Sequence, residues 1–428
     1  DAPPLSAAAP LPIIPPLLPV VPPPAPSSPS SPSSRQLART AARYAPEPKD
    51  ASSQESALLR ELQAGSFEAG ERLIALYGAR AAERTRDVLV VRRHQAGLRL
   101  GDAASLHRLH AAAILDGNVV QARAVEHVLA LVDPETDSPT PPPLANQRHA
   151  PDLVASLLYR SVADSPVHEA LAIVLDTGLY RRDVAQYQLT GVARVQPGAT
   201  TVLGDMFGTV SRFLGQARTA LFHQRTTAAP SAQIALLSPP AIVFAGDVRE
   251  ETPDLLYLLG ASLTGAMAEH ALVNALSEDA LRTLLDALLA AFGPVANLPR
   301  SNAAVARLGQ NLWQLVPPRA DRRLRELCTS PISYDSAVSG SRQAMRRAGL
   351  FAAGGLAIAL PLVAFELGLP PEPEDSPQWL SNLCDAYPSI ADLVRLSIRA
   401  EFAEARWQQA SPLDRRRVET GPRSRAGA

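Results

Sequence analysis

The chain has 428 residues, 46% of them hydrophobic, and a formal net charge of −1. This length allows two or three domains with a hydrophobic core, and this composition excludes disorder of the whole chain. The charge balance excludes attraction to nucleic acid or to an anionic membrane by bulk charge. Cys328 and Cys384 are the only cysteines. They are too few for a four-cysteine zinc site and favour a reducing compartment, so we expect a cytoplasmic protein.

Residues 1–50 are rich in proline and serine, with runs such as Pro22-Pro23-Pro24. Such a sequence favours extended polyproline geometry and cannot bury enough apolar area to fold. We predict a disordered tether between domains, with a docking segment for a proline-binding domain as the alternative. The chain begins at Asp1 rather than at a methionine. We therefore expect it to be a processed or truncated piece of a longer protein.

Residues 52–133 carry apolar side chains at three-and-four spacing, interrupted by short polar turns such as Asp116-Gly117-Asn118. This pattern predicts an array of antiparallel helical hairpins. The array resembles degenerate tetratricopeptide repeats, although the regular period of about 34 residues is missing. A second proline-rich segment, residues 134–151, follows it and predicts a linker.

Residues 152–410 predict a second domain, in which long amphipathic segments indicate helices and short β-rich runs indicate three strands. The fold class is therefore mainly α with a small β-sheet (α+β). The charged tail, residues 411–428, predicts disorder. The predicted strands are residues 219–226, 234–237 and 241–245, and the predicted helices are residues 152–160, 166–175, 254–276, 278–292, 302–316, 320–328, 333–360 (broken at its glycines) and 376–407.

Two short strands within residues 233–245 precede a long apolar helix that opens at Thr252-Pro253-Asp254. This arrangement resembles the core of the zinc metallopeptidases that include heat-shock membrane proteases and prenyl-protein proteases. In that family the helix carries H-E-x-x-H, two zinc-binding histidines one turn apart with a glutamate beside them. A glutamate on a later helix, in a motif like E-x-x-A-D, supplies the third ligand. The domain is also similar to a module that recurs in large bacterial repeat proteins.

The residues that would bind zinc are missing here, and small side chains stand in their place. In the later stretch, residues 340–349, a basic residue or glutamine stands where the resemblance implies a carboxylate, and a guanidinium opposes a bound cation. We therefore expect no catalytic residue, metal or cofactor. The small residues either admit another helix at close range or line an inactive cleft that holds a peptide. This pseudo-active-site helix is formed by Gly260, Ala261, Ser262, Thr264 and Gly265.

Two alternatives remain open at this point. His223, Glu269 and His270 would rebuild a zinc site in a divergent metallopeptidase, although no two of them have the i,i+4 spacing of a helical chelate. Residues 348–365 carry no charge, which would suit a membrane-attached protein, but Pro361 and several glycines favour a buried helix.

The lost ligands and the helical array together predict a non-catalytic interaction or scaffold protein, that is, a pseudoenzyme. We expect its partners to be other proteins or peptides, and we expect it to bind neither nucleic acid nor membranes.

Overall fold

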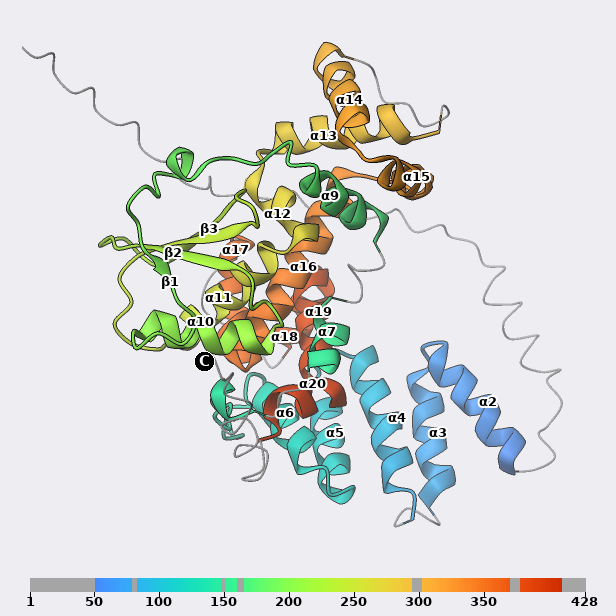
Figure 1. Ribbon diagram of the computed structural model, residues 1–428. Helices are drawn as coiled ribbons and strands as arrows, with labels where there is room; N and C mark the ends of the chain where they lie inside the picture. Colours follow the sequence, from blue (N-terminus) through green and yellow to red (C-terminus); the bar gives the residue numbers. More distant parts are fainter. Residues whose placement is uncertain are drawn as a thin grey trace, which may run out of the picture.

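The computed structural model describes most of the chain, and the predicted tether (residues 1–50) and tail (residues 411–428) lie outside the described residues. Within the described part the protein is mostly helical and contains one small mixed sheet, which confirms the predicted fold class (Figure 1). The described residues are 51–78, 83–147, 151–159, 165–294, 302–369 and 378–409.

The N-terminal part is a row of antiparallel helices, each packed on the next. The side chains of Ser66, Asp102 and Asn118 cap three of them by accepting a backbone N–H from the first turn, which satisfies a donor that the helix leaves free. Repeat-like helix packing is therefore present. The helices are α2 (Ala51–Gln63), α3 (Phe67–Tyr77), α4 (Thr85–Leu98), α5 (Ala103–Leu115) and α6 (Val119–Leu129).

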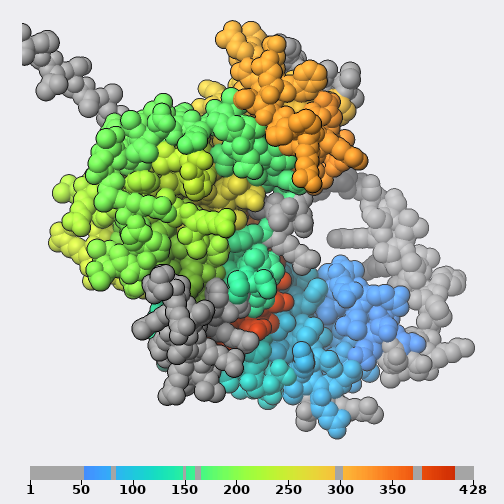
Figure 2. Space-filling view, viewed as in Figure 1, coloured from blue at the N-terminus to red at the C-terminus, as the bar shows by residue number. Residues whose placement is uncertain are grey.

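Among the remaining helices, α11 and α12 pack on the sheet, α20 packs on α6 and α7, and α14 and α15 (orange) project from the body in Figure 2. These remaining helices are α7 (Pro151–Leu158), α9 (Pro166–Asp176), α10 (Val202–Phe213), α11 (Pro253–Gly265), α12 (Ala268–Ala275), α13 (Glu278–Phe292), α14 (Ala303–Leu315), α15 (Pro318–Leu327), α16 (Tyr334–Ala353), α17 (Leu356–Glu366), α18 (Trp379–Ala386), α19 (Pro388–Ser397) and α20 (Ala400–Trp407), with the 3-10 helices η2 (Leu144–Asn146) and η3 (Val184–Tyr187).

The sheet has the order β1-β2-β4-β3, in which β2 and β4 are parallel and the two outer pairs are antiparallel. Three strands were predicted, and the fourth, β1, has only two residues and no pattern that would reveal it. One face, with Ile242 and Phe244, joins the main core on the side of α11. The other face, with Val243, packs under Leu189. The strands are β1 (Arg194–Val195), β2 (Ala220–Gln224), β3 (Ser231–Ala235) and β4 (Ala241–Ala245).

The helical array and the C-terminal helices share one hydrophobic core. Only the first hairpin has a small core of its own, which includes Leu62, Leu73 and Tyr77. From Leu89 onward the buried apolar side chains of the array belong to the main core, which extends to Trp407, except that Val91 packs with the first hairpin. Helix α6 packs against α17, α19 and α20. The hydrophobic core therefore continues across the position where the sequence predicts a boundary between the array and a second domain.

The predicted linker is a packed segment in its described part, residues 134–147. We call residues 139–143 the proline strap. Arg406 on α20 donates to the carbonyl oxygen of Pro142 (Nη1–O, 2.7 Å), and His127 Nδ1 lies 3.2 Å from that of Pro139. Leu144, directly after the strap, is buried. Proline has a carbonyl group but no backbone N–H, so the strap presents mainly hydrogen-bond acceptors. Side chains on α6 and α20 supply the donors.

The long helix predicted over residues 254–276 is two helices, and the prediction of one was wrong. Helix α11 ends at Gly265, and α12 follows after a bend of 104°. Met267 at the bend has an extended backbone (φ −64°, ψ 152°), although methionine is a good helix former. The bend brings α12 against α9 and β3, so tertiary packing overrides local propensity here. Likewise, the helix predicted over 376–407 is divided into α18, α19 and α20.

The uncharged segment 348–365 is broken between α16 and α17 at Gly354, whose backbone is left-handed (φ 101°). Helix α17 is short and buries Leu360 and Val363, whereas Phe365 is exposed. In the described part of the chain, no single helix has the length and apolar character needed to cross a bilayer. Helices α11 and α12 meet that test only as a pair, across their bend.

Candidate functional site

The face of α11 predicted as a pseudo-active site is buried against α16. Its five small residues are all buried. A Cβ atom built on Gly260 would lie 2.6 Å from the carbonyl oxygen of Ala348 and 2.8 Å from the Cβ atom of Ala352. The small residues therefore serve close helix packing, the first of the two roles the sequence suggested. A peptide has no room on this face.

The two stretches that the resemblance aligns with zinc ligands do lie face to face. Gly349, in the later stretch, lies under the ring of Tyr257 on α11, and Met345 lies beside Gly265. The two polar side chains among the five small residues of α11 have hydrogen-bonding neighbours within the packing. Ser262 donates to the carbonyl oxygen of Leu258 (2.6 Å), and Thr264 Oγ1 lies 3.4 Å from the hydroxyl of Tyr159.

The alternative zinc ligands are not brought together. His223 lies on β2, where its Nε2 is 2.8 Å from the carbonyl oxygen of Gly246 and its ring packs on Phe244. Glu269 and His270 lie on α12, beyond the bend, so they do not share a helix with the small residues of α11. In the described residues no group of three or more histidine, cysteine, aspartate or glutamate side chains is placed to hold a metal ion.

His270 is fully buried, and neither of its ring nitrogens has a hydrogen-bond partner. Its ring meets that of His168 edge to face, with centroids 5.3 Å apart. His168 is itself satisfied, because its Nε2 donates to the carbonyl oxygen of Ala337 and its Nδ1 accepts from the hydroxyl of Ser165. Burial, with a smaller contribution from His168, lowers the pKa of His270 to about 3.

The buried state of His270 predicts acid sensitivity. Below pH 6.5 the unfolded chain takes up a proton at this position, whereas the folded protein does not accept it until the pH nears 3. The free energy of unfolding therefore falls as the pH falls, by up to about 1.4 kcal/mol per pH unit for this residue. Urea unfolding of wild type and His270→Leu between about pH 7.5 and pH 5 will show that the free energy of unfolding depends less steeply on pH in the variant. An equally steep pH dependence in both proteins would show that His270 does not cause the acid sensitivity.

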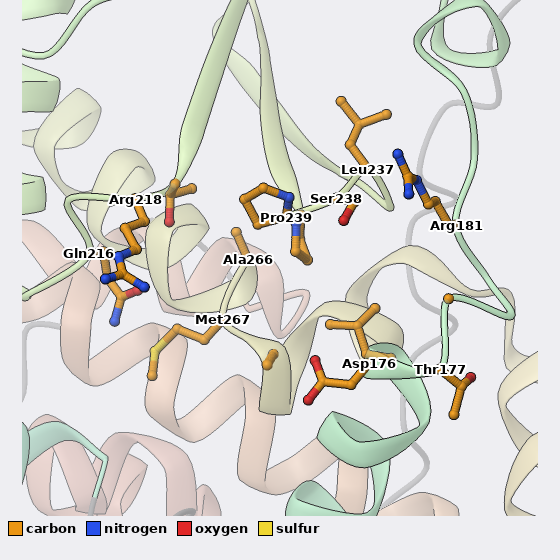
Figure 3. A pocket seen from close by; sticks show the side chains of 15 residues that line it. Asp176, Thr177, Arg181, Gln216, Arg218, Leu237, Ser238, Pro239, Ala266 and Met267 are labelled. Carbon is orange, nitrogen blue, oxygen red and sulfur yellow. The ribbon is translucent and has the colours of Figure 1, made fainter. Parts of the chain in front are cut away.

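An open cavity of about 740 Å³ lies at one end of the sheet, where four parts of the chain meet (Figure 3). Its walls are the end of α9, the segment before β2, the loop between β3 and β4, and the bend between α11 and α12. We call it the sheet-end cleft. It is lined by Leu175, Asp176, Thr177, Gly178, Arg181, Gln216, Arg218, Thr219, Leu237, Ser238, Pro239, Pro240, Ala266, Met267 and Ala268.

A smaller cavity of about 250 Å³ adjoins the cleft and shares with it the loop around Pro239 and the side chain of Arg181. Its other walls include Arg182, Arg194 and Phe222. In Figure 3, Arg218 and Arg181 stand on opposite sides of the larger cavity, with Pro239 and Met267 between them. We call the two cavities together the groove. They share the loop around Pro239, but Phe222 lies on the face of the sheet with Leu189, whereas Ala266 lies on the side of the main core. Arginines line both cavities, which suits a ligand with acidic groups.

The sequence analysis missed the sheet-end cleft. Its walls come from turns after α9, before β2 and between β3 and β4, which are far apart in sequence. The sequence of each turn indicates only a connection between two secondary-structure elements. The bend at Met267 lies within a segment that was predicted to be helical. The one local signal was Ser238-Pro239-Pro240, which marks a rigid turn but does not indicate a cavity.

The fold thus defines a helical α+β protein in which the small-residue face of α11 is buried and a separate cleft is open. No family model, curated protein or solved structure matches the chain. The geometry of the cleft and the packing of α11 on α16 are therefore the features that bear on function.

Proposed function

We propose that the protein is a non-catalytic interaction scaffold that binds a peptide segment of a partner in the sheet-end cleft. The observation that carries this proposal is the pair of open cavities, about 740 Å³ and about 250 Å³ in volume, that share the loop at Pro239. Ligand sites typically have volumes of about 300–1,000 Å³ and mix apolar walls with a few polar groups. The two-part shape favours an extended segment over a compact small molecule.

We also propose that the scaffold derives from a peptidase-like framework. Its support is the packing of α11 on α16, because Gly260 meets Ala348 and Tyr257 meets Gly349 where the family would place its ligand-bearing segments opposite each other. In this chain, side chains and backbone fill the space between α11 and α16. A peptide would therefore bind in the neighbouring sheet-end cleft, at the end of α11.

The helical array supplies a second feature that supports an interaction role. Ile114, Leu115 and Val119 surround the turn between α5 and α6 and are 53%, 74% and 54% exposed. Large apolar side chains that cluster on a surface mark contact sites more often than single ones do. The array thus has an exposed apolar patch in addition to the cleft.

Filling the cleft tests the proposal. Peptides are selected from a random library displayed on phage, and their affinities for the full chain are measured by fluorescence anisotropy. Met267→Trp places an indole between the walls of the cleft and will weaken the selected peptides by at least about tenfold, equivalent to about 1.4 kcal/mol. Val90→Trp, at an exposed site on α4 away from the turn between α5 and α6, will leave the affinities unchanged. Mass spectrometry will recover the bound peptides intact.

Equal weakening by both tryptophan variants would place the peptide site elsewhere. A library that yields no binder, or cleavage of the bound peptides, would overturn the proposed function itself.

A further inference from the structure

The walls of the groove carry four arginines. Arg181 and Arg218 line the larger cavity, and Arg181, Arg182 and Arg194 line the smaller one. None of the four forms an ion pair with a residue in the described part of the chain. Some arginines elsewhere are held by carboxylates, as Arg347 is by Asp392.

The local charge differs from that of the whole chain. The two cavities hold four arginines but only two acidic residues, Asp176 and Asp183, an excess of two positive charges (4 − 2 = 2). The chain as a whole carries −1. A local excess of one sign on an otherwise balanced chain attracts ligands of the opposite sign.

The backbone fixes two of these arginines in place. The N–H of Arg181 donates to the carbonyl oxygen of Gly178 (3.0 Å), and that of Arg182 donates to the carbonyl oxygen of Leu236 at the end of β3 (2.9 Å). Arg194 lies on β1, which pairs with β2. Because hydrogen bonds hold the main chain at these arginines, binding of a ligand has to order only their side chains. The entropic cost of binding is therefore lower.

We infer that the ligand of the groove is an acidic peptide segment whose carboxylates pair with these arginines. This inference rests on the proposed function. A guanidinium binds a carboxylate through two parallel hydrogen bonds, and the free guanidinium groups on both sides of the groove suit carboxylates spaced along an extended chain. The carboxylates of Asp176 and Asp183 oppose a dense phosphate backbone, so a peptide fits better than a nucleic acid.

The test uses the full chain and two fluorescein-labelled dodecapeptides, one alternating glutamate and serine, the other alternating glutamine and serine. Anisotropy titrations will show that the glutamate peptide binds at least about tenfold more tightly, and that this preference shrinks between about 50 mM and about 500 mM NaCl. Arg181→Glu/Arg218→Glu will abolish the preference. Arg307→Glu/Arg319→Glu, on exposed faces of α14 and α15, makes the same change in net charge and will preserve it.

Several outcomes would overturn the inference. One is equal affinity for the two dodecapeptides. Another is equal loss of the preference for the glutamate peptide in both double variants, which would show that the net charge of the chain alone causes the preference. Tighter binding of a twelve-nucleotide oligothymidylate than of the glutamate peptide would assign the groove to nucleic acid. If library-selected peptides still bind and Met267→Trp still weakens them, the proposed function survives these failures.

Discussion

Replacing Arg406 with methionine is expected to lower the free energy of unfolding by about 2–6 kcal/mol, about 1–3 kcal/mol for each of two buried carbonyl groups that lose their donor. Arg406 is 1% exposed and has no carboxylate partner among the described residues. Instead, its Nε donates to the carbonyl oxygen of Phe351 and its Nη1 to that of Pro142, each at 2.7 Å. Burial lowers the pKa of its guanidinium to about 9. Methionine fills much of the volume but leaves both carbonyl groups buried without a donor.

The carbonyl group of Phe351 lies in the last turn of α16, where carbonyl groups lack partners within the helix. Arg406 thus caps α16 from another helix, and the negative end of the helix dipole compensates the buried cation. Gly354 completes the arrangement, because a side chain at this left-handed position would collide with the guanidinium.

Urea unfolding measures the loss, and hydrogen exchange will show faster exchange in residues 134–147 of the variant. Arg395→Met is the matched control, since Arg395 lies exposed on α19 and its replacement is expected to change stability by less than about 0.5 kcal/mol. A loss below about 1 kcal/mol in Arg406→Met would show that the two carbonyl groups find other donors or water.

Gly260→Leu is expected to cost about 3 kcal/mol or more, because α11 and α16 leave no space for its side chain. The Cβ atom alone would lie 2.6 Å from the carbonyl oxygen of Ala348. That oxygen belongs to the backbone of a helix and cannot rotate away, so α16 would have to shift as a unit. Such a shift would disturb the main core, to which Ala348 and Ala352 both belong.

Gly97→Leu is the matched control, since no atom lies within 4 Å of a Cβ atom at this position on α4. Leucine is a better helix former than glycine by about 0.8 kcal/mol, so this variant is expected to be as stable as wild type or slightly more stable. Thermal and urea unfolding of the two variants give the comparison. Equal stability of Gly260→Leu and wild type would show that the two helices do not meet at this point.

Local sequence patterns were sufficient for most elements. Helices α13 and α16 and strands β2 and β4 match the predicted segments, because their apolar periodicity and end signals agree with the packing they enter. The small residues around Gly260 correctly indicated a close helix.

The failures share a physical cause. The bend at Met267, the packed proline strap and the sheet-end cleft arise from contacts between distant segments. The strap shows this most clearly. Its prolines predict a spacer because they cannot join regular structure, yet their carbonyl groups are the acceptors that a buried arginine 264 residues away requires.

The position of α20 at the end of the described chain has a consequence for synthesis on the ribosome. Gln121 of α6 donates to the carbonyl oxygen of Ile398, 277 residues later, and α6 and α7 both pack on α20. At about 5–20 residues per second, roughly 14–55 s separate the emergence of these partners. During that interval the apolar face of the N-terminal hairpins stays uncovered. We expect the nascent chain to need a chaperone at this stage, and shortened chains that lack α20 to aggregate.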